Sequence, residues 1–209
     1  MRFGLVLALL LVVPAGVAEE VERVLALVNG VPILASDVEL ASIAQLVPRL
    51  PQEEEEAYRR AVVEALVALE LRYQDLAEAR ISQRVAYDWQ RAWQKAVEQA
   101  GGPQALEEKL AQAGLSQGDL ARLVRRAALV EAYVAKRFAA AVRVSQAELQ
   151  AFYVQEFLPS WPPHQGPPPP LEQVRGPLEA ALKERKLTQE VQRWTQELAQ
   201  RGEVIRYFR

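Results

Sequence analysis

The sequence predicts a mostly α-helical protein that is closed by a small antiparallel β-sheet. Apolar residues recur at intervals of three and four over long stretches of the chain, which is the spacing of one helix face. Apolar, β-branched segments typical of strands lie near both ends, so we expect the N-terminal hairpin, with its strand 24–28, to pair with a C-terminal strand, 204–208. Ser followed three residues later by Asp or Glu, a helix-start signal, occurs at three places: Ser36/Glu39, Ser116/Asp119 and Ser145/Glu148.

The first two strands are predicted on either side of Asn29-Gly30. Residues 23–28 are apolar and β-branched, and Val31–Leu34 would be the returning strand. An Asn-Gly pair tolerates positive φ and is a strong short-range hairpin signal. Pro32 has no N–H to donate to a ladder, so the second strand should be short and lie at an edge of the sheet. A two-stranded hairpin alone is marginal in water, which is why a third strand is expected.

A series of helices should follow the hairpin, and the first should open at Ser36. The longest is predicted over 53–79, about 40 Å at a rise of roughly 1.5 Å per residue. Its apolar face is predicted from seven residues: Ala57, Ala61, Ala65, Leu66, Leu69, Tyr73 and Leu76. Gly and Pro then divide the chain into further helices over 83–100, 103–113, 116–138 and 145–157.

A proline-rich segment, residues 159–170, separates these helices from the C-terminal part of the chain. Seven of the protein's thirteen prolines lie in it, so we expect an extended, stiff connector without helix. Helix should resume over 171–199, where Leu178 and Leu187 lie about 180° apart around the helix axis. The two halves of this helix are therefore predicted to pack on different partners.

Composition argues against most enzymes and against metal sites. The chain has no Cys and a single His, His164, which excludes disulfides, thiolate metal ligands, a Cys nucleophile and a site built from two imidazoles. No Gly-rich phosphate loop or Ser/His/Asp set is visible, so we expect no enzymatic activity, no cofactor and no metal. With 25 basic and 27 acidic residues, the charge balance gives no reason to expect nucleic-acid binding.

The first eighteen residues have the three-part pattern of a secretory signal peptide. Arg2 precedes an uninterrupted apolar run over 3–13, and Gly-Val-Ala at 16–18 places small residues before a predicted cut after Ala18. This run is too short to span a bilayer, and no later segment reaches membrane-spanning length. An uncleaved anchor or a buried N-terminal helix is the alternative. We expect the mature chain, 19–209, to be soluble and outside the cytoplasm.

Several segments of the chain, taken in order, resemble the N-terminal and C-terminal parts of the proteins of one known family. Val24–Val38 reads VLALVNGVPILASDV, a hydrophobic strand followed by an Asn-Gly turn, an Ile and a Ser-Asp helix start. These features resemble the opening of the periplasmic SurA-type chaperones and their relatives among secreted parvulin foldases. Val144–Tyr153 is similar to the helix that leads into the isomerase domain of that family. The family's C-terminal helix and closing strand resemble residues 171–175, 182–187, Trp194 and 204–208.

The resemblance implies a chaperone that lacks an isomerase domain. Where the family has a parvulin peptidyl-prolyl isomerase domain, this chain has only the linker 159–170, without the paired histidines or the strands of that domain. By the resemblance, residues 19–158 form a helical chaperone domain, and the C-terminal helix and strand, 171–209, pack back on it. The linker would also permit a homodimer in which two copies exchange the 171–199 helix.

The function that this resemblance implies is an ATP-independent periplasmic chaperone, a holdase. Its partners would be unfolded or nascent envelope polypeptides, including outer-membrane proteins, and the step from family to function is an analogy. The alternative is a non-catalytic interaction module for one dedicated cell-envelope partner.

Aromatic side chains are the candidates for client binding. Trp89 and Trp93 lie one helical turn apart, and they are either core residues or part of a binding groove. Tyr153 and Phe157 carry the same two alternatives. Trp161 lies in proline-rich sequence with no predicted helix to cover it, so we expect its indole to be exposed.

Overall fold

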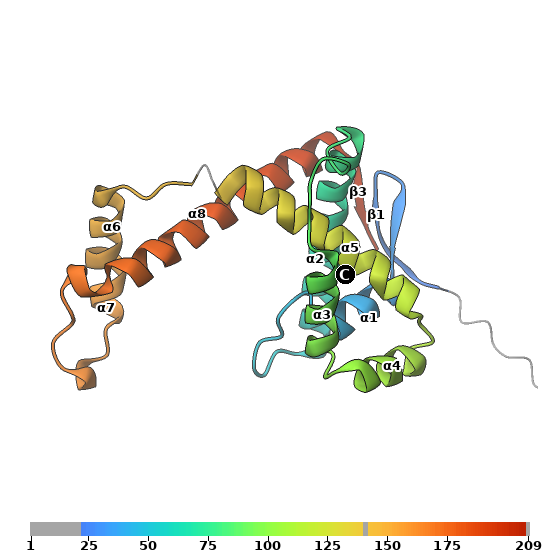
Figure 1. Ribbon diagram of the computed structural model, residues 1–209, viewed down its shortest axis with the longest axis horizontal. Helices are drawn as coiled ribbons and strands as arrows, with labels where there is room; N and C mark the ends of the chain where they lie inside the picture. Colours follow the sequence, from blue (N-terminus) through green and yellow to red (C-terminus); the bar gives the residue numbers. More distant parts are fainter. Residues whose placement is uncertain (1–21, 140–141, 208–209) are drawn as a thin grey trace, which may run out of the picture.

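The computed structural model describes residues 22–139 and 142–207, and it is 68% helical with one small sheet (Figure 1). The predicted fold class, mostly α with a small antiparallel sheet, is confirmed. The predicted signal peptide, residues 1–18, lies outside the described residues. Within the described ranges, no helix is both long enough and apolar enough to cross a membrane.

The three strands form an antiparallel sheet in the order β2-β1-β3. β1 (Val24–Val28) pairs with β2 (Val31–Leu34) on one side and with β3 (Val204–Arg206) on the other. In the second pairing Val28 lies opposite Val204. The two ends of the described chain therefore meet in one sheet, as predicted, although β3 is shorter than the strand expected over 204–208.

Five helices pack together with the sheet and form the main group of helices (Figure 1). α2 lies at the centre of this group and packs against α1, α5 and β1. Its buried apolar face is Tyr58, Val62, Val63, Leu66, Val67, Leu71 and Leu76. The five helices are α1 (Ala35–Ile43), α2 (Glu55–Glu78), α3 (Trp89–Gln99), α4 (Pro103–Gln112) and α5 (Gln117–Val134). α5 continues into a π-helical turn, Ala135–Ala139.

A chain of polar contacts fastens the two ends to the helices. The N–H of Asn29 donates to the carbonyl oxygen of Glu203 (2.8 Å), and Asn29 Oδ1 accepts from the Glu203 N–H (2.7 Å). Asn29 Nδ2 donates to Gln74 Oε1 (2.7 Å), and Gln74 Nε2 donates to the buried carboxylate of Glu70 (2.9 Å). Arg126 forms a 3.0 Å ion pair with Glu70. The hairpin turn, the C-terminal segment, α2 and α5 are thereby connected.

The predicted cap of the first helix is wrong. α1 begins at Ala35, and the Asp37 carboxylate accepts from the N–H of Leu34 (2.8 Å). Because Asp37 satisfies this N–H at the start of the helix, Ser36 and Glu39 do not form the expected capping pair. The other two predicted caps are confirmed, with N–H to Oγ distances of 3.2 Å in each: Ser116 with Asp119 and Ser145 with Glu148.

The helix predicted over 83–100 begins only at Trp89. α2 ends in a turn in which Arg80 has a positive φ of 52°, and irregular backbone follows up to residue 88. The Asp88 carboxylate then accepts from the N–H of Arg91 (2.9 Å) and caps α3. The cap residue, rather than the apolar spacing upstream of it, decides where this helix starts.

A second, smaller group of helices projects from the first (Figure 1). α6 (Gln146–Phe152) continues through a π-helical turn, Tyr153–Phe157, into α7 (Leu158–Ser160). The proline-rich segment then reverses the chain through a 3₁₀ turn at Pro163–Gln165 and a positive φ of 80° at Gly166. The expectation of an extended connector without helix is therefore wrong, because proline fits the first turn of a helix and two of these prolines stand at such positions.

α8 (Leu171–Arg201) connects the two groups of helices. At its start, Leu171 and Leu178 form a buried cluster with Leu149 of α6. Near its end, Trp194 belongs to the main core. The two halves of the helix thus pack on different partners, as predicted. In this structure α8 packs within its own chain, and the exchange of this helix between two copies stays a prediction.

Replacing Gly202 with alanine should destabilise the protein by about 1–3 kcal/mol. A Cβ atom at Gly202 would lie 2.6 Å from Asn29 Oδ1, so the Asn29 side chain would have to shift, which weakens the hydrogen bond that Oδ1 accepts from the Glu203 N–H. Urea denaturation followed by circular dichroism measures the change. Gly118→Ala in α5 is the control: a Cβ there comes no closer than 3.5 Å to another atom, and stability should hold or rise by up to about 1 kcal/mol. Equal stability of the Gly202→Ala protein and the parent would contradict the role of this contact.

The contact between α6 and α8 should weaken in acid through Glu148. Its carboxylate accepts from Lys186 Nζ (2.7 Å) and from the N–H and Oγ of Ser145 (2.8 Å each), and these donors lower its pKa from 4.5 to about 2. Because the folded-state pKa is the lower one, the carboxylate stabilises the fold above about pH 4.5, and this contribution is lost as the pH falls toward 2.

Glu148→Gln should therefore flatten the pH dependence of the unfolding free energy across that acidic range, measured by denaturant titrations at successive pH values. Glu184→Gln is the control, because Glu184 is exposed on α8, the helix that carries Lys186, and makes no ion pair among the described residues. A Glu148→Gln profile that matches the parent would show that this carboxylate does not contribute.

Candidate functional site

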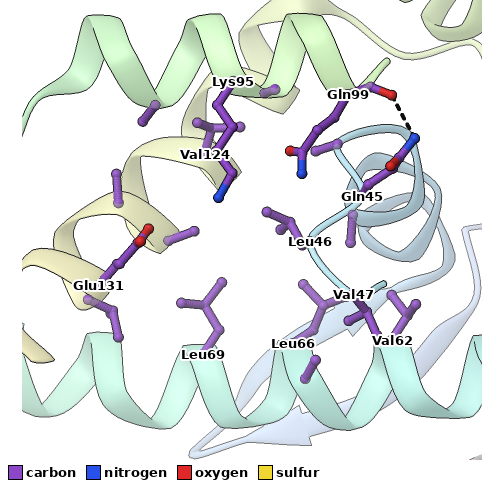
Figure 2. Close-up of a pocket in the computed structure, with 18 of the residues that line it drawn as sticks. Gln45, Leu46, Val47, Val62, Leu66, Leu69, Lys95, Gln99, Val124 and Glu131 are labelled. Atoms are coloured by element: carbon purple, nitrogen blue, oxygen red, sulfur yellow. Dashed lines mark hydrogen bonds between the residues drawn. The ribbon is translucent and has the colours of Figure 1, made fainter. Parts of the chain in front are cut away.

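An apolar cavity of about 470 Å³ lies within the main group of helices, and we call it the groove. In Figure 2, α2 and α3 form opposite sides, and α5 and the loop after α1 close the remaining sides. Gln45 Nε2 donates to the Gln99 carbonyl oxygen (2.6 Å) and ties this loop to α3. The half-buried Leu46, Val47 and Leu69 lie where the groove meets solvent. Seven alanines, six valines and three leucines line it, with five polar residues: Gln45, Arg72, Lys95, Gln99 and Glu131.

Short side chains leave the groove unfilled. Where the three helices face one another, the lining includes Ala65 of α2, Ala92 and Ala96 of α3, and Ala127 and Ala128 of α5. Protein interiors are close-packed and contain few voids larger than a water molecule. Ligand sites have volumes of roughly 300–1,000 Å³ and are mostly apolar with a few polar groups. The size and lining of the groove therefore match a binding site better than a packed core.

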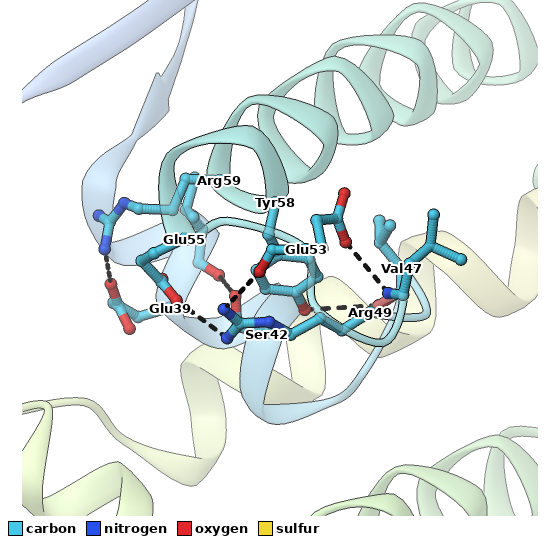
Figure 3. A network of polar contacts seen from close by, with 10 residues as sticks. Glu39, Ser42, Val47, Arg49, Glu53, Glu55, Tyr58 and Arg59 are labelled. Carbon is cyan, nitrogen blue, oxygen red and sulfur yellow. Dashed lines mark hydrogen bonds and ion pairs between the residues drawn. The ribbon is translucent and has the colours of Figure 1, made fainter.

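The loop between α1 and α2 is fixed by polar contacts, so the wall that it contributes is held in place (Figure 3). Arg49 forms a 2.9 Å ion pair with Glu55 at the start of α2. The Tyr58 hydroxyl donates to the carbonyl oxygen of Val47 (3.4 Å), and the Arg49 guanidinium lies 5.1 Å from the centre of the Tyr58 ring. These contacts hold the loop against α2.

Trp89 and Trp93 attach α3 to the main core and are not among the residues that line the groove. Both indoles are half-buried and pack against the core, with ring centroids 5.6 Å apart. The Arg125 guanidinium lies 4.4 Å from the centre of the Trp89 ring. Trp93 also borders a second depression, of about 510 Å³, between α3 and α4. The two tryptophans thus position one wall of the groove without lining it.

Tyr153, Phe157 and Trp161 lie in the smaller group of helices. The ring centroids of Tyr153 and Phe157 are 5.5 Å apart, as are those of Phe157 and Trp161. The Tyr153 hydroxyl donates to the carbonyl oxygen of Pro169 (2.9 Å), and Trp161 Nε1 donates to that of Gly166 (3.1 Å). The expectation that Trp161 is exposed is wrong: its indole is half-buried, because Phe157 and the reversed proline-rich segment pack against it.

Three charged side chains line the groove: Arg72, Lys95 and Glu131. None of them forms an ion pair with any residue in the part of the chain that the structure describes. Arg72 is half-buried, its Nε donates to the carbonyl oxygen of Ala68 (2.8 Å), and burial lowers the pKa of its guanidinium. Lys95 and Glu131 are exposed at the rim.

Sequence reasoning missed the groove. The apolar stripe predicted for the longest helix includes Ala65, Leu66 and Leu69, all of which line it. Spacing alone shows that these residues face inward, but it does not show whether another side chain fills the space opposite them. The available signal was the abundance of alanine on three helices at once, which favours close backbones or a void over a densely packed core.

Comparison with known proteins assigns no family. The chain matches no protein-family model, and no curated protein is significantly similar to it in sequence. Within residues 22–139 and 142–207, no group of three or more His, Cys, Asp or Glu side chains is placed to hold a metal ion. The functional interpretation therefore rests on the geometry and the lining of the groove.

The groove should bind a neutral apolar dye, and a bulky side chain at Ala92 should block it. Ala92→Trp places an indole in the groove from α3 and should weaken dye binding by about ten-fold or more in a fluorescence titration. Gln90→Trp is the matched control, since Gln90 is exposed on the same helix and does not line the groove. Thermal denaturation verifies that both variants fold. Equal dye affinity of a folded Ala92→Trp protein and the control would contradict this assignment of the site.

Proposed function

We propose that the protein is an ATP-independent chaperone that holds unfolded polypeptides of the cell envelope in the groove. The observation that supports this proposal is a cavity of about 470 Å³ with apolar walls and fixed surroundings inside a small helical protein. Such a surface binds extended apolar segments, and it needs neither bond chemistry nor a nucleotide to do so. The resemblance of the Val24–Val38 sequence and of the C-terminal helix to the SurA-type chaperones supports the same function.

The size of the groove fits a weak and reversible hold. A dissociation constant of micromolar order corresponds to about 8 kcal/mol. Each fully buried large apolar side chain contributes roughly 1.5–3 kcal/mol, and association costs several kcal/mol in lost freedom. A few large side chains of an unfolded chain, seated against alanine and valine walls, would therefore reach micromolar affinity and little more. Because hydrophobic contact is not directional, many sequences would bind.

The smaller group of helices offers a second apolar surface for the same client. The half-buried rings of Tyr153, Phe157 and Trp161 form a row of neighbouring rings that runs from the π-helical turn to the residue after α7. Val154, on the same segment, is 48% exposed. A chain held in the groove and continuing onto this surface would gain affinity from two modest contacts in place of one strong one.

The cellular location is part of the proposal. It rests on the signal-peptide pattern of residues 1–18 and on the resemblance to a periplasmic family. Export to the periplasm would place the groove among unfolded envelope proteins, where no nucleotide-driven release is at hand.

The protein should suppress aggregation of a denatured outer-membrane protein at near-stoichiometric ratios and without ATP, measured by light scattering. Ala92→Trp should lose most of this effect because the indole occupies the groove, whereas Gln90→Trp should retain it. Client binding by fluorescence anisotropy should follow the same order.

Two outcomes would count against a general chaperone. Failure to suppress aggregation of several unrelated clients would exclude it. In that case, capture of a single saturable partner from a periplasmic extract, lost in the Ala92→Trp variant, would favour the alternative of an interaction module with one dedicated partner.

A further inference from the structure

We propose that the groove selects apolar segments that carry an acidic side chain, Asp or Glu, over otherwise equal segments that carry Lys or Arg. This inference rests on the proposed function and specifies its client class. It follows from the charged residues that line the groove, because none of them has an ion-pair partner among the described residues.

Arg72 is the first of these residues. It lines, from α2, a groove made mainly of Ala, Val and Leu, and it is half-buried there. Its only hydrogen bond among the described residues is from Nε to the carbonyl oxygen of Ala68. The two terminal nitrogens of the guanidinium are therefore left for water or a ligand. Burial disfavours the charged form, which lowers the pKa of Arg72, and a carboxylate beside it would offset that cost.

A partly desolvated guanidinium without a carboxylate partner is unusual, because arginine removed from water is normally paired. Three arginines of this protein pair with a carboxylate even though their own side chains are exposed. Arg126 pairs with Glu70, Arg185 with Glu156 and Arg206 with Glu64. Arg72 is more buried than these three and has no carboxylate partner among the described residues. Its planar donors suit a carboxylate, to which arginine binds with two parallel hydrogen bonds.

Lys95 is the second residue. Lys95 belongs to α3, the wall of the groove opposite α2. In Figure 2 its side chain runs from α3 into the groove toward Val124. It forms no ion pair among the described residues. A segment bound between α2 and α3 would thus meet a cation on each side.

Glu131 on α5 is the one acidic residue that lines the groove, so the charged lining consists of two cations and one anion. Glu131 is exposed to solvent, whereas Arg72 is half-buried, and charges act more strongly where water is excluded. The electrostatic balance inside the groove therefore favours a negative group. A lysine on the client would lie near Arg72 and would be repelled.

The test uses three peptides that share one apolar core of Leu and Phe and differ only in flanking residues, which are Glu, Gln or Lys. Each is acetylated and amidated, so that no terminal charge contributes. By isothermal titration calorimetry, the Glu peptide should bind about five- to ten-fold more tightly than the Lys peptide, with the Gln peptide between them. The ratio should shrink when salt is raised from about 50 mM to about 500 mM.

Variants identify the residues responsible. Arg72→Gln combined with Lys95→Gln should reduce the Glu-to-Lys ratio to less than about two-fold, and Arg72→Lys should restore part of it because it keeps the charge. Glu131→Gln should increase the ratio. Arg91→Gln is the matched control, because Arg91 is an exposed residue of α3 that does not line the groove. Removing its positive charge should leave the Glu-to-Lys affinity ratio unchanged. Thermal denaturation shows which variants are folded.

The outcomes separate this inference from the proposed function. If all three peptides bind equally and Ala92→Trp abolishes their binding, the groove holds clients without regard to charge and the inference is overturned alone. If no peptide binds, or if Ala92→Trp binds them as well as the parent does, the groove is not a client site and both proposals fail. A preference for Glu that survives in the folded double variant would also overturn the role of Arg72 and Lys95.

Discussion

The side-chain amide of Asn29 joins the two ends of the described chain to the central helix. Asn29 is the only asparagine in the sequence, and it accepts a backbone hydrogen bond from Glu203 through its carbonyl oxygen while it donates to Gln74 through its nitrogen. The buried carboxylate of Glu70 continues the chain, and an unpaired carboxylate at that depth would be strongly destabilising. Gln74 and Arg126 both contact it, so every member of the network is satisfied. This network consequently holds the sheet, α2 and α5 together.

This anchoring explains how a void persists in a small protein. The Asn29 network fixes the C-terminal half of α2, and the Arg49–Glu55 ion pair, together with the Tyr58 hydroxyl, fixes the loop at its other end. α3 is held separately, because it packs mainly on α5 and α4 and its tryptophans pack against the core. Because α3 and the loop after α1 are fastened at other points than α2 and α5, the alanine-rich faces do not close on one another. The groove is thus a product of where the helices are fastened, as much as of the small residues that line it.

Features with a single local chemical cause could be predicted from the sequence, and features set by competing groups or by distant parts of the chain could not. The Asn-Gly turn and the Ser116 cap act through residues one to three positions away, and both are found where expected. At the first helix two caps compete, and Asp37 bonds the Leu34 N–H in place of the Ser36 pair. Trp161 is covered by a chain reversal that proline content alone does not reveal. The groove belongs to the same category, since it depends on which faces are left without a partner.

Under the proposed function, the groove would also release the client that it holds. Apolar burial gives about the same free energy per unit area in the groove as in the client's own core. The client's core forms within one chain, so it does not bear the loss of translational and rotational freedom that binding to a second molecule imposes. For such a client, folding would therefore win whenever its apolar side chains find one another, and no nucleotide would be needed to drive their departure. The charged groups at Arg72 and Lys95 fit this scheme, because an acidic side chain of a folding client regains its full hydration in water once it leaves the partly desolvated wall.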